Sequence, residues 1–105
     1  MLRVTAEKSV SLALAGLAPD KQAAVLAALR RLPTVFGRPH AHAGLGLRQL
    51  RRGVYEARIG LHIRVLFERD GELLVIKMFG NHAAIRRYLR DRARAFRSLT
   101  PHTSS

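Results

Sequence analysis

The chain contains no cysteine and no tryptophan, and only seven of its 105 residues are acidic. Without cysteine, disulfides, thiolate metal sites and cysteine nucleophiles are excluded. No apolar run approaches the roughly 20 residues that a membrane span needs, and the N-terminal residues lack the continuous apolar core of a signal peptide. We therefore expect a soluble, cytoplasmic protein that is not bound to a membrane.

Basic side chains are abundant: 19 lysines and arginines face seven acidic residues, giving a net charge of +12. Most are arginine, whose planar fork suits phosphate groups. This excess favours a polyanionic partner such as a nucleic acid. The hydrophobic fraction of 48% is that of an ordinary folded protein. The length predicts one domain over residues 1–105, with a frayed polar tail at 98–105.

The N-terminal half has the pattern of two helices with a tight connection. Residues 7–17 and 19–32 carry apolar side chains at helical spacing, and the Ala18-Pro19 step separates them. Pro19 suits the first turn of the second helix, and Pro33 is expected to end it. The two segments predict a helical hairpin.

Two weaker segments flank the hairpin. Residues 2–5 alternate weakly and favour a short edge strand, and a loop is expected over 33–46. His40 and His42 lie in this Gly/Pro-rich loop without a third ligand nearby, so we interpret them as solvent-exposed and expect no metal site.

Three later runs, 54–59, 62–69 and 72–79, alternate with period two and predict an antiparallel meander. Gly60-Leu61 and Asp70-Gly71 are the expected turns. A short strand is plausible over residues 45–50. The period puts Met78 on an apolar face that the helical hairpin covers, and it puts polar side chains on a solvent-facing side. The side chains predicted there are Glu56, Arg58, His62, Arg64, Glu68 and Lys77, with Val75 and Phe79 among them.

The final element is predicted as a helix that begins after Asn81, a good N-cap, and runs to about Arg97. The predicted class is α+β: a helical hairpin packed on an antiparallel sheet of three to four strands, followed by a C-terminal helix. The arginines of this helix form either a solvated face or a stripe that binds a polyanion.

The sequence predicts a phosphate site on the sheet and at the strand-to-helix junction that follows it. Arg58 and Arg64 lie on adjacent strands and point the same way, which is unfavourable unless an anion lies between them. Glu56 supplies part of that anion, and a substrate phosphate can supply the rest. His82 stands at a strand-to-helix junction, where backbone N–H groups attract anions and a histidine can exchange protons. Tyr88 either reaches this site or fills the core.

The ordinary interpretation is that a solvated sheet face carries charged pairs that stabilise it. By that interpretation, His62 and Lys77 are bystanders or supports. Two roles stay open for three further arginines, which either bind RNA or are only solvated: Arg48, Arg51 and Arg52.

Three motifs occur in order: a Y-x-x-R-I-G step, an I-R-V-L-F strand and a G-x-H-x-x-x-x-x-Y ending. In this order and spacing the chain resembles the RelE/ParE superfamily of type II toxins over nearly all of its length. The resemblance implies a helical hairpin on a twisted antiparallel sheet. The resemblance to RelE-like members implies a metal-independent endoribonuclease that needs no cofactor. Such an enzyme cuts mRNA on the ribosome when a 2′-hydroxyl attacks the neighbouring phosphate. The resemblance further implies a cognate antitoxin and a toxin–antitoxin hetero-oligomer.

The resemblance also implies residue roles. Arg64 matches the arginine that holds the scissile phosphate, His82 the general acid or charge stabiliser, and Tyr88 the tyrosine that orients or stacks on substrate. Arg58 matches a basic position on the preceding strand. Glu56 falls at a variable position, and its role as the base is a hypothesis.

The candidate contacts to RNA phosphates are Arg48, Arg51, Arg52, Lys77 and Arg86. Two other activities stay open. A ParE-like member poisons gyrase and usually lacks the terminal His/Tyr pair. A catalytically inert member binds DNA or an antitoxin through the arginine-rich helix.

Overall fold

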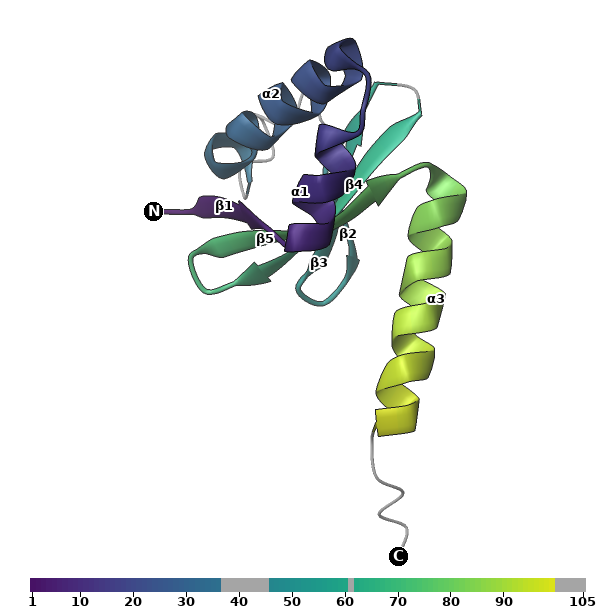
Figure 1. The fold of residues 1–105 in the computed structure, drawn as a ribbon. Helices are drawn as coiled ribbons and strands as arrows, with labels where there is room; N and C mark the ends of the chain where they lie inside the picture. Colours follow the sequence, from purple (N-terminus) through teal and green to yellow (C-terminus); the bar gives the residue numbers. More distant parts are fainter. Residues whose placement is uncertain (37–45, 61, 100–105) are drawn as a thin grey trace, which may run out of the picture.

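The structure is a computed structural model that describes residues 1–36, 46–60 and 62–99, with side chains through residue 94. The elements in chain order (Figure 1) are β1 (Arg3–Ala6), α1 (Lys8–Ala15), α2 (Pro19–Val35), β2 (Arg48–Arg51), β3 (Val54–Ile59), β4 (Ile63–Asp70), β5 (Leu73–Gly80) and α3 (His82–Leu99). The predictions for His40, His42 and Leu61 lie outside the described residues, as does the tail from residue 100 onward.

The helical hairpin forms as expected, with one correction. Pro19 lies in the first turn of α2, but the helix continues through Pro33 to Val35. The proline removes one N–H, yet the last turn is still closed by the Phe36 N–H, which donates to the Leu32 carbonyl at 2.9 Å. Burial of Leu32 and Val35 in the core holds this turn against the sheet, and tertiary packing therefore overrides the local stop signal.

The sheet has five strands in the order β1-β5-β4-β3-β2. It is mixed rather than purely antiparallel, because β1 runs parallel to β5 while the other neighbours are antiparallel. Both weak strand predictions are confirmed as the edge strands β1 and β2. The prediction of three to four strands was too low, because the sheet includes both edge strands, each four residues long.

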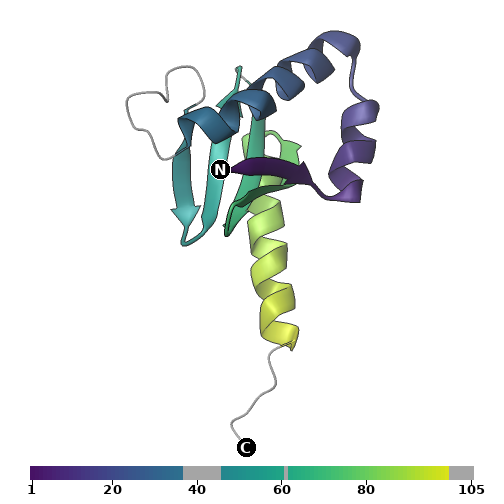
Figure 2. The ribbon, with the colours of Figure 1, turned by 90° about the vertical axis from the view of Figure 1, so that its left-hand side faces the viewer.

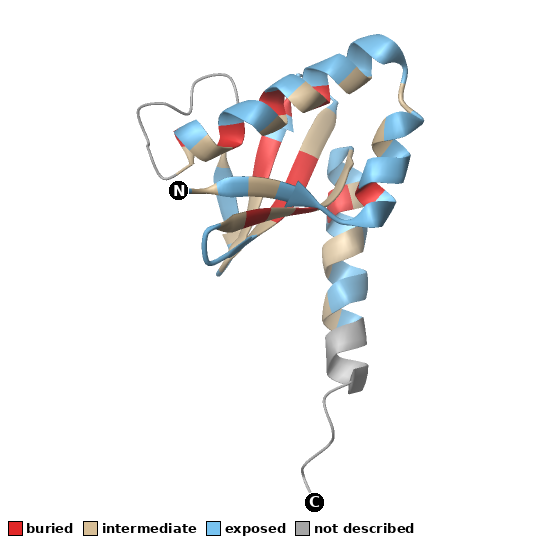
Figure 3. Ribbon diagram, turned by 60° about the vertical axis from the view of Figure 1, so that its left-hand side comes forward, coloured by how far each residue is buried: buried red, intermediate tan, exposed pale blue. Residues whose placement is uncertain are grey.

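The main core lies where α1 and α2 cover one face of the sheet (Figure 3). Val25 and Leu32 of α2 are fully buried against Val65 and Ile76. Phe67 is 0% exposed and joins an aromatic cluster, in which its ring centroid lies 5.6 Å from that of Tyr55 and 5.8 Å from that of Phe36. This burial is the chief source of stability for a chain of this size.

A β-bulge in β5 changes which side chains share a face. Leu66 pairs with Met78, but the next residue, Phe67, pairs with Ile76, so Lys77 is an extra residue. One inserted residue reverses the alternation beyond it. Phe79 therefore packs against the main core and Met78 shares the face of Leu66, which is the reverse of the sequence prediction.

The opposite face of the sheet is not simply open to solvent, as the alternation predicted. The start of α3 packs on it, with Ile85 1% exposed and Leu66 of β4 0% exposed. Arg92 of α3 forms an ion pair with Glu68 of β4. Figure 2 shows α3 leaving the sheet on the side away from α2. The apolar side of α3 thus covers part of a sheet face that was expected to be solvated.

Two boundaries differ slightly from prediction. Asp70 pairs with Leu73, so the hairpin turn is Gly71-Glu72 rather than Asp70-Gly71. Gly71 has φ of 61°, as the first position of a type II′ turn requires. The N-cap is confirmed, since the Asn81 side chain accepts a hydrogen bond from the Ala84 N–H at 2.8 Å. The helix then extends to Leu99, past the predicted end.

Replacement of Phe67 by alanine should lower the free energy of unfolding by about 3–5 kcal/mol, because it empties a fully buried site. Leu12→Ala is the control, since Leu12 is 66% exposed and should change stability by less than about 0.5 kcal/mol. Urea unfolding followed by circular dichroism measures both. Equal losses from the two variants would contradict this placement of the core.

Candidate functional site

The candidate site is a row of positions across three strands that ends at a helix N-terminus. Arg58 of β3 is directly opposite Arg64 of β4, and Arg64 is directly opposite Gly80 of β5. Directly opposed residues on one sheet face have Cβ atoms about 4.5–5.5 Å apart, so the two arginines repel one another. His82 begins α3 two residues after Gly80. The row therefore gathers positive charge beside a helix end that also attracts anions.

Arg64 is fixed from beneath by Glu56. This carboxylate is 2% exposed and is the only buried charged side chain among the described residues. Its Oε1 accepts a hydrogen bond from Arg64 Nη1 at 3.0 Å and lies 3.4 Å from Arg48 Nε. A carboxylate is costly to bury unless it is paired and hydrogen-bonded. The pairing therefore holds the Arg64 side chain, itself only 19% exposed, in one orientation.

The position of His82 depends on a close approach between β5 and α3. A Cβ on Gly80 would lie 2.9 Å from the Ala84 Cβ, so only glycine lets the first turn of α3 pass this close to the strand. Asn81 caps the helix from between them, and the His82 side chain is exposed at its start. An exposed imidazole at a helix N-terminus is available to a bound anion and can transfer a proton to it.

Tyr88 and Lys77 form a separate cluster. Lys77 Nζ lies 3.2 Å from Glu7 Oε2, and Tyr88 is half-buried beside this pair. Burial raises the pKa of the Tyr88 phenol above its ordinary value of 10.0; the Lys77 charge opposes the rise and the Glu7 charge adds to it. Tyr88 and Arg86 lie on opposite flanks of α3, since two residues turn a helix by about 200°. The tyrosine thus faces the α1 side of the molecule.

The predicted RNA contacts divide into three groups. Arg51, Arg52 and Arg86 border a hollow between α3 and the β2–β3 hairpin, whose two parts measure about 380 and 500 Å³. Arg48 is instead a partner of Glu56, and Lys77 a partner of Glu7. The same hollow is lined by Arg90 and Arg92, which the sequence interpretation did not single out. Arg90 could have been identified from the sequence, because it follows Arg86 by one helical turn and so lies on the same side of the helix.

Within the described residues, no group of three or more side chains is arranged to hold a metal ion. In that same part of the chain, none of the helices is long and apolar enough to cross a membrane.

Comparison with known proteins gives matches of structure alone. No family model and no curated protein sequence matches the chain. A chain of the toxin–antitoxin complex RelBE2 from Mycobacterium tuberculosis superposes with a TM-score of 0.61 at 24% identity, covering 77% of this chain and 98% of that one. For the RelE–RelB complex of the archaeon Pyrococcus horikoshii the TM-score is 0.60 at 20% identity, covering 76% and 93%. For YafQ of Escherichia coli it is 0.52 at 18%, covering 81% and 98%.

The chain therefore has the fold of the RelE-like toxins. The predicted α+β class and the resemblance drawn from the motifs are confirmed at the level of the fold. These matches cover 93–98% of the solved chains and 76–81% of this chain.

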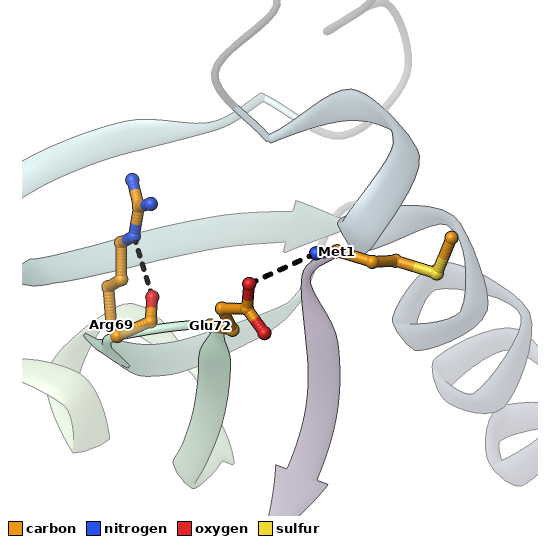
Figure 4. Close-up of polar contacts among 4 residues, drawn as sticks. Met1, Arg69 and Glu72 are labelled. Atoms are coloured by element: carbon orange, nitrogen blue, oxygen red, sulfur yellow. Dashed lines mark hydrogen bonds and ion pairs between the residues drawn. The ribbon is translucent and has the colours of Figure 1, made fainter.

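Glu56→Gln should lower the free energy of unfolding by about 2 kcal/mol, because it leaves two arginines without their charged acceptor. Glu72→Gln is the control. Glu72 pairs with the N-terminal amine at 3.3 Å, but its side chain is 71% exposed (Figure 4). An exposed pair contributes about 0–1 kcal/mol. Urea unfolding of both variants compares them, and a Glu56 loss no larger than the Glu72 loss would refute the buried pair.

Tyr88 should titrate above pH 10.0 in the native protein. Because folding raises this pKa, the phenol's contribution to stability is present below the unfolded value and is lost as pH rises through the folded value. The difference in tyrosinate absorbance between wild type and Tyr88→Phe measures the midpoint. Lys77→Met should move it higher, since the Lys77 charge lowers the pKa. A midpoint at or below 10.0, unmoved by Lys77→Met, would contradict the cluster.

Proposed function

We propose that the protein is the toxin of a type II toxin–antitoxin pair and cuts mRNA on the ribosome without a metal ion. One observation carries this proposal: the buried Glu56–Arg64 pair fixes a guanidinium beside Arg58, at the helix N-terminus where His82 begins. Fixed cations next to a proton donor suit the cleavage of a phosphodiester. The fold adds support, because matched chains come from toxin–antitoxin complexes.

In the proposed reaction, the 2′-oxygen of a ribose attacks the adjacent phosphorus. A new bond from O2′ to phosphorus forms and the bond to the 5′-oxygen breaks, leaving a 2′,3′-cyclic phosphate and a free 5′-hydroxyl. The pentacovalent intermediate carries extra negative charge, which Arg58 and Arg64 stabilise. His82 donates a proton to the departing 5′-oxygen.

We assign Glu56 a positioning role in preference to the role of base. Its carboxylate lies beneath Arg64 and is 2% exposed, so a 2′-hydroxyl reaches it only by displacing the arginine. The 2′-hydroxyl proton then passes to solvent water, and the site works chiefly by binding the phosphate.

An antitoxin completes the proposal. The net charge of +12 favours a partner with an acidic segment, because complementary charge speeds association. The expected assembly is a toxin–antitoxin hetero-oligomer in the cytoplasm, and release of the acidic segment exposes the row of arginines. Tyr88 and Lys77 support α3 from the other flank, outside the reacting groups.

His82→Gln should reduce the rate of mRNA cleavage by about 10²–10³-fold, since it removes the proton donor. His62→Gln is the matched control, because His62 is also exposed but lies in the turn between β3 and β4, outside the row. A purified translation system with primer extension on the mRNA measures both rates. Cleavage by His82→Gln at the wild-type rate would exclude this residue as the acid.

The gyrase-poisoning alternative makes a different prediction. If wild-type protein leaves mRNA intact in the same system but causes gyrase-dependent DNA breaks, the nuclease proposal is wrong. If it does neither, the protein is an inert binding member of the fold.

A further inference from the structure

A furrow runs between α3 and the β2–β3 hairpin, beyond the arginine row. We call it the α3 furrow and define it by six residues: Arg51, Arg52, Arg86, Leu89, Arg90 and Ala93. Its two hollows share Arg51, Leu89 and Ala93, so they are continuous. Each hollow exceeds the roughly 300 Å³ at which small-ligand sites begin.

The charge of the α3 furrow is uncompensated. Its four arginines make no ion pair and no side-chain hydrogen bond within the described part of the chain. The acidic residue that lines the hollow, Glu68, is already paired with Arg92. Several guanidinium groups around one hollow repel each other unless an anion lies among them. The charge of the furrow therefore matches a partner that carries more than one negative charge.

The spacing of these groups indicates what kind of polyanion fits. His82, Arg86 and Arg90 follow each other at four-residue intervals, so they share one flank of α3 and rise about 6 Å at each step. That step is close to the separation of successive phosphates in an extended single strand. Leu89 and Ala93, both half-buried, form an apolar floor between the arginines. Such a floor suits the face of an unpaired base.

We infer that the α3 furrow binds single-stranded RNA that flanks the cleavage point. The inference rests on the proposed function: with the scissile phosphate at His82, the next two phosphates of the strand meet Arg86 and Arg90. Arg51 and Arg52 close the furrow from the hairpin side. The protein therefore recognises several nucleotides on one side of the cut, through backbone charge rather than base identity.

The test is a comparison of two double variants of equal net charge. Arg86→Gln/Arg90→Gln removes two furrow charges. Arg30→Gln/Arg87→Gln is the control: it removes two exposed charges, one from α2 and one from a different flank of α3, and leaves the same net charge. Binding is measured for an RNA oligonucleotide that spans the furrow and carries a 2′-deoxy sugar at the cleavage position, so that chemistry does not contribute.

The furrow variant should bind this oligonucleotide about tenfold or more weakly than the control variant. The slope of log affinity against log salt should be shallower by roughly 1.4 for two lost single-strand phosphate contacts. Binding of a dinucleotide, too short to enter the furrow, should be equal in both variants. Equal binding of the long oligonucleotide by both variants overturns the inference.

The outcomes also separate this inference from the nuclease proposal. If wild-type protein binds the oligonucleotide through the furrow but cuts no mRNA, the reaction is wrong and the furrow stands. If His82→Gln abolishes cleavage while the furrow variant binds normally, the reaction stands and the furrow is wrong. If poly-glutamate binds through the furrow arginines and the RNA does not, the occupant is an acidic protein segment and the inference fails.

Discussion

The arrangement of the candidate site depends on one buried carboxylate. Glu56 is buried on the sheet face that α3 covers; its Oε1 accepts a hydrogen bond from Arg64 at 3.0 Å and lies 3.4 Å from Arg48 Nε in an ion pair. These three residues come from β3, β4 and β2, so one acid joins three neighbouring strands. An unpaired charge in this place would be strongly destabilising, and the arginines are therefore held where the carboxylate requires them. This constraint turns a flexible arginine into a fixed phosphate-binding group.

The helix α3 strengthens this ion pair by covering the sheet face on which it lies. Ile85 of α3 and Leu66 of β4 exclude water from the face on which Glu56 lies, and a drier surrounding strengthens the ion pair. The same helix begins at Gly80-Asn81, so its N-terminus and His82 meet the end of the arginine row. One element thus shields the buried charge and also delivers the histidine. The fold and the candidate chemistry are linked through α3.

The sequence patterns predicted the parts of this structure whose signals are long or chemically distinctive. Period two over β3 and β4, the Pro19 start of α2 and the Asn81 cap are all in place. The bulge at Lys77 was missed because a lysine between apolar residues fits a regular strand equally well. It reversed Met78 and Phe79, and so two core assignments were wrong. Register is a property of two strands, and one strand's sequence does not reveal an extra residue.

The candidate site was predicted in its residues more than in its geometry. Arg58 and Arg64 are directly opposite each other, as the alternation predicted, and His82 begins α3 two residues after Gly80, which pairs with Arg64. The burial of Glu56 was not foreseen, because the amphipathic stripe of α3 fits a solvated helix as well as one that covers a sheet. The position of Tyr88 beside Lys77 and Glu7 was not foreseen either. The rotation of a helix about its axis is set by its packing against the sheet, and the helix sequence alone does not give it.

The most direct test of the central claim is a double-mutant cycle on the mRNA cleavage rate with Glu56→Gln and Arg64→Lys. If Glu56 acts by positioning Arg64, the two substitutions remove one shared function, and the double variant cleaves about as fast as the slower single variant. If the losses multiply, Glu56 has a task of its own, such as accepting the 2′-hydroxyl proton, and the positioning account is contradicted.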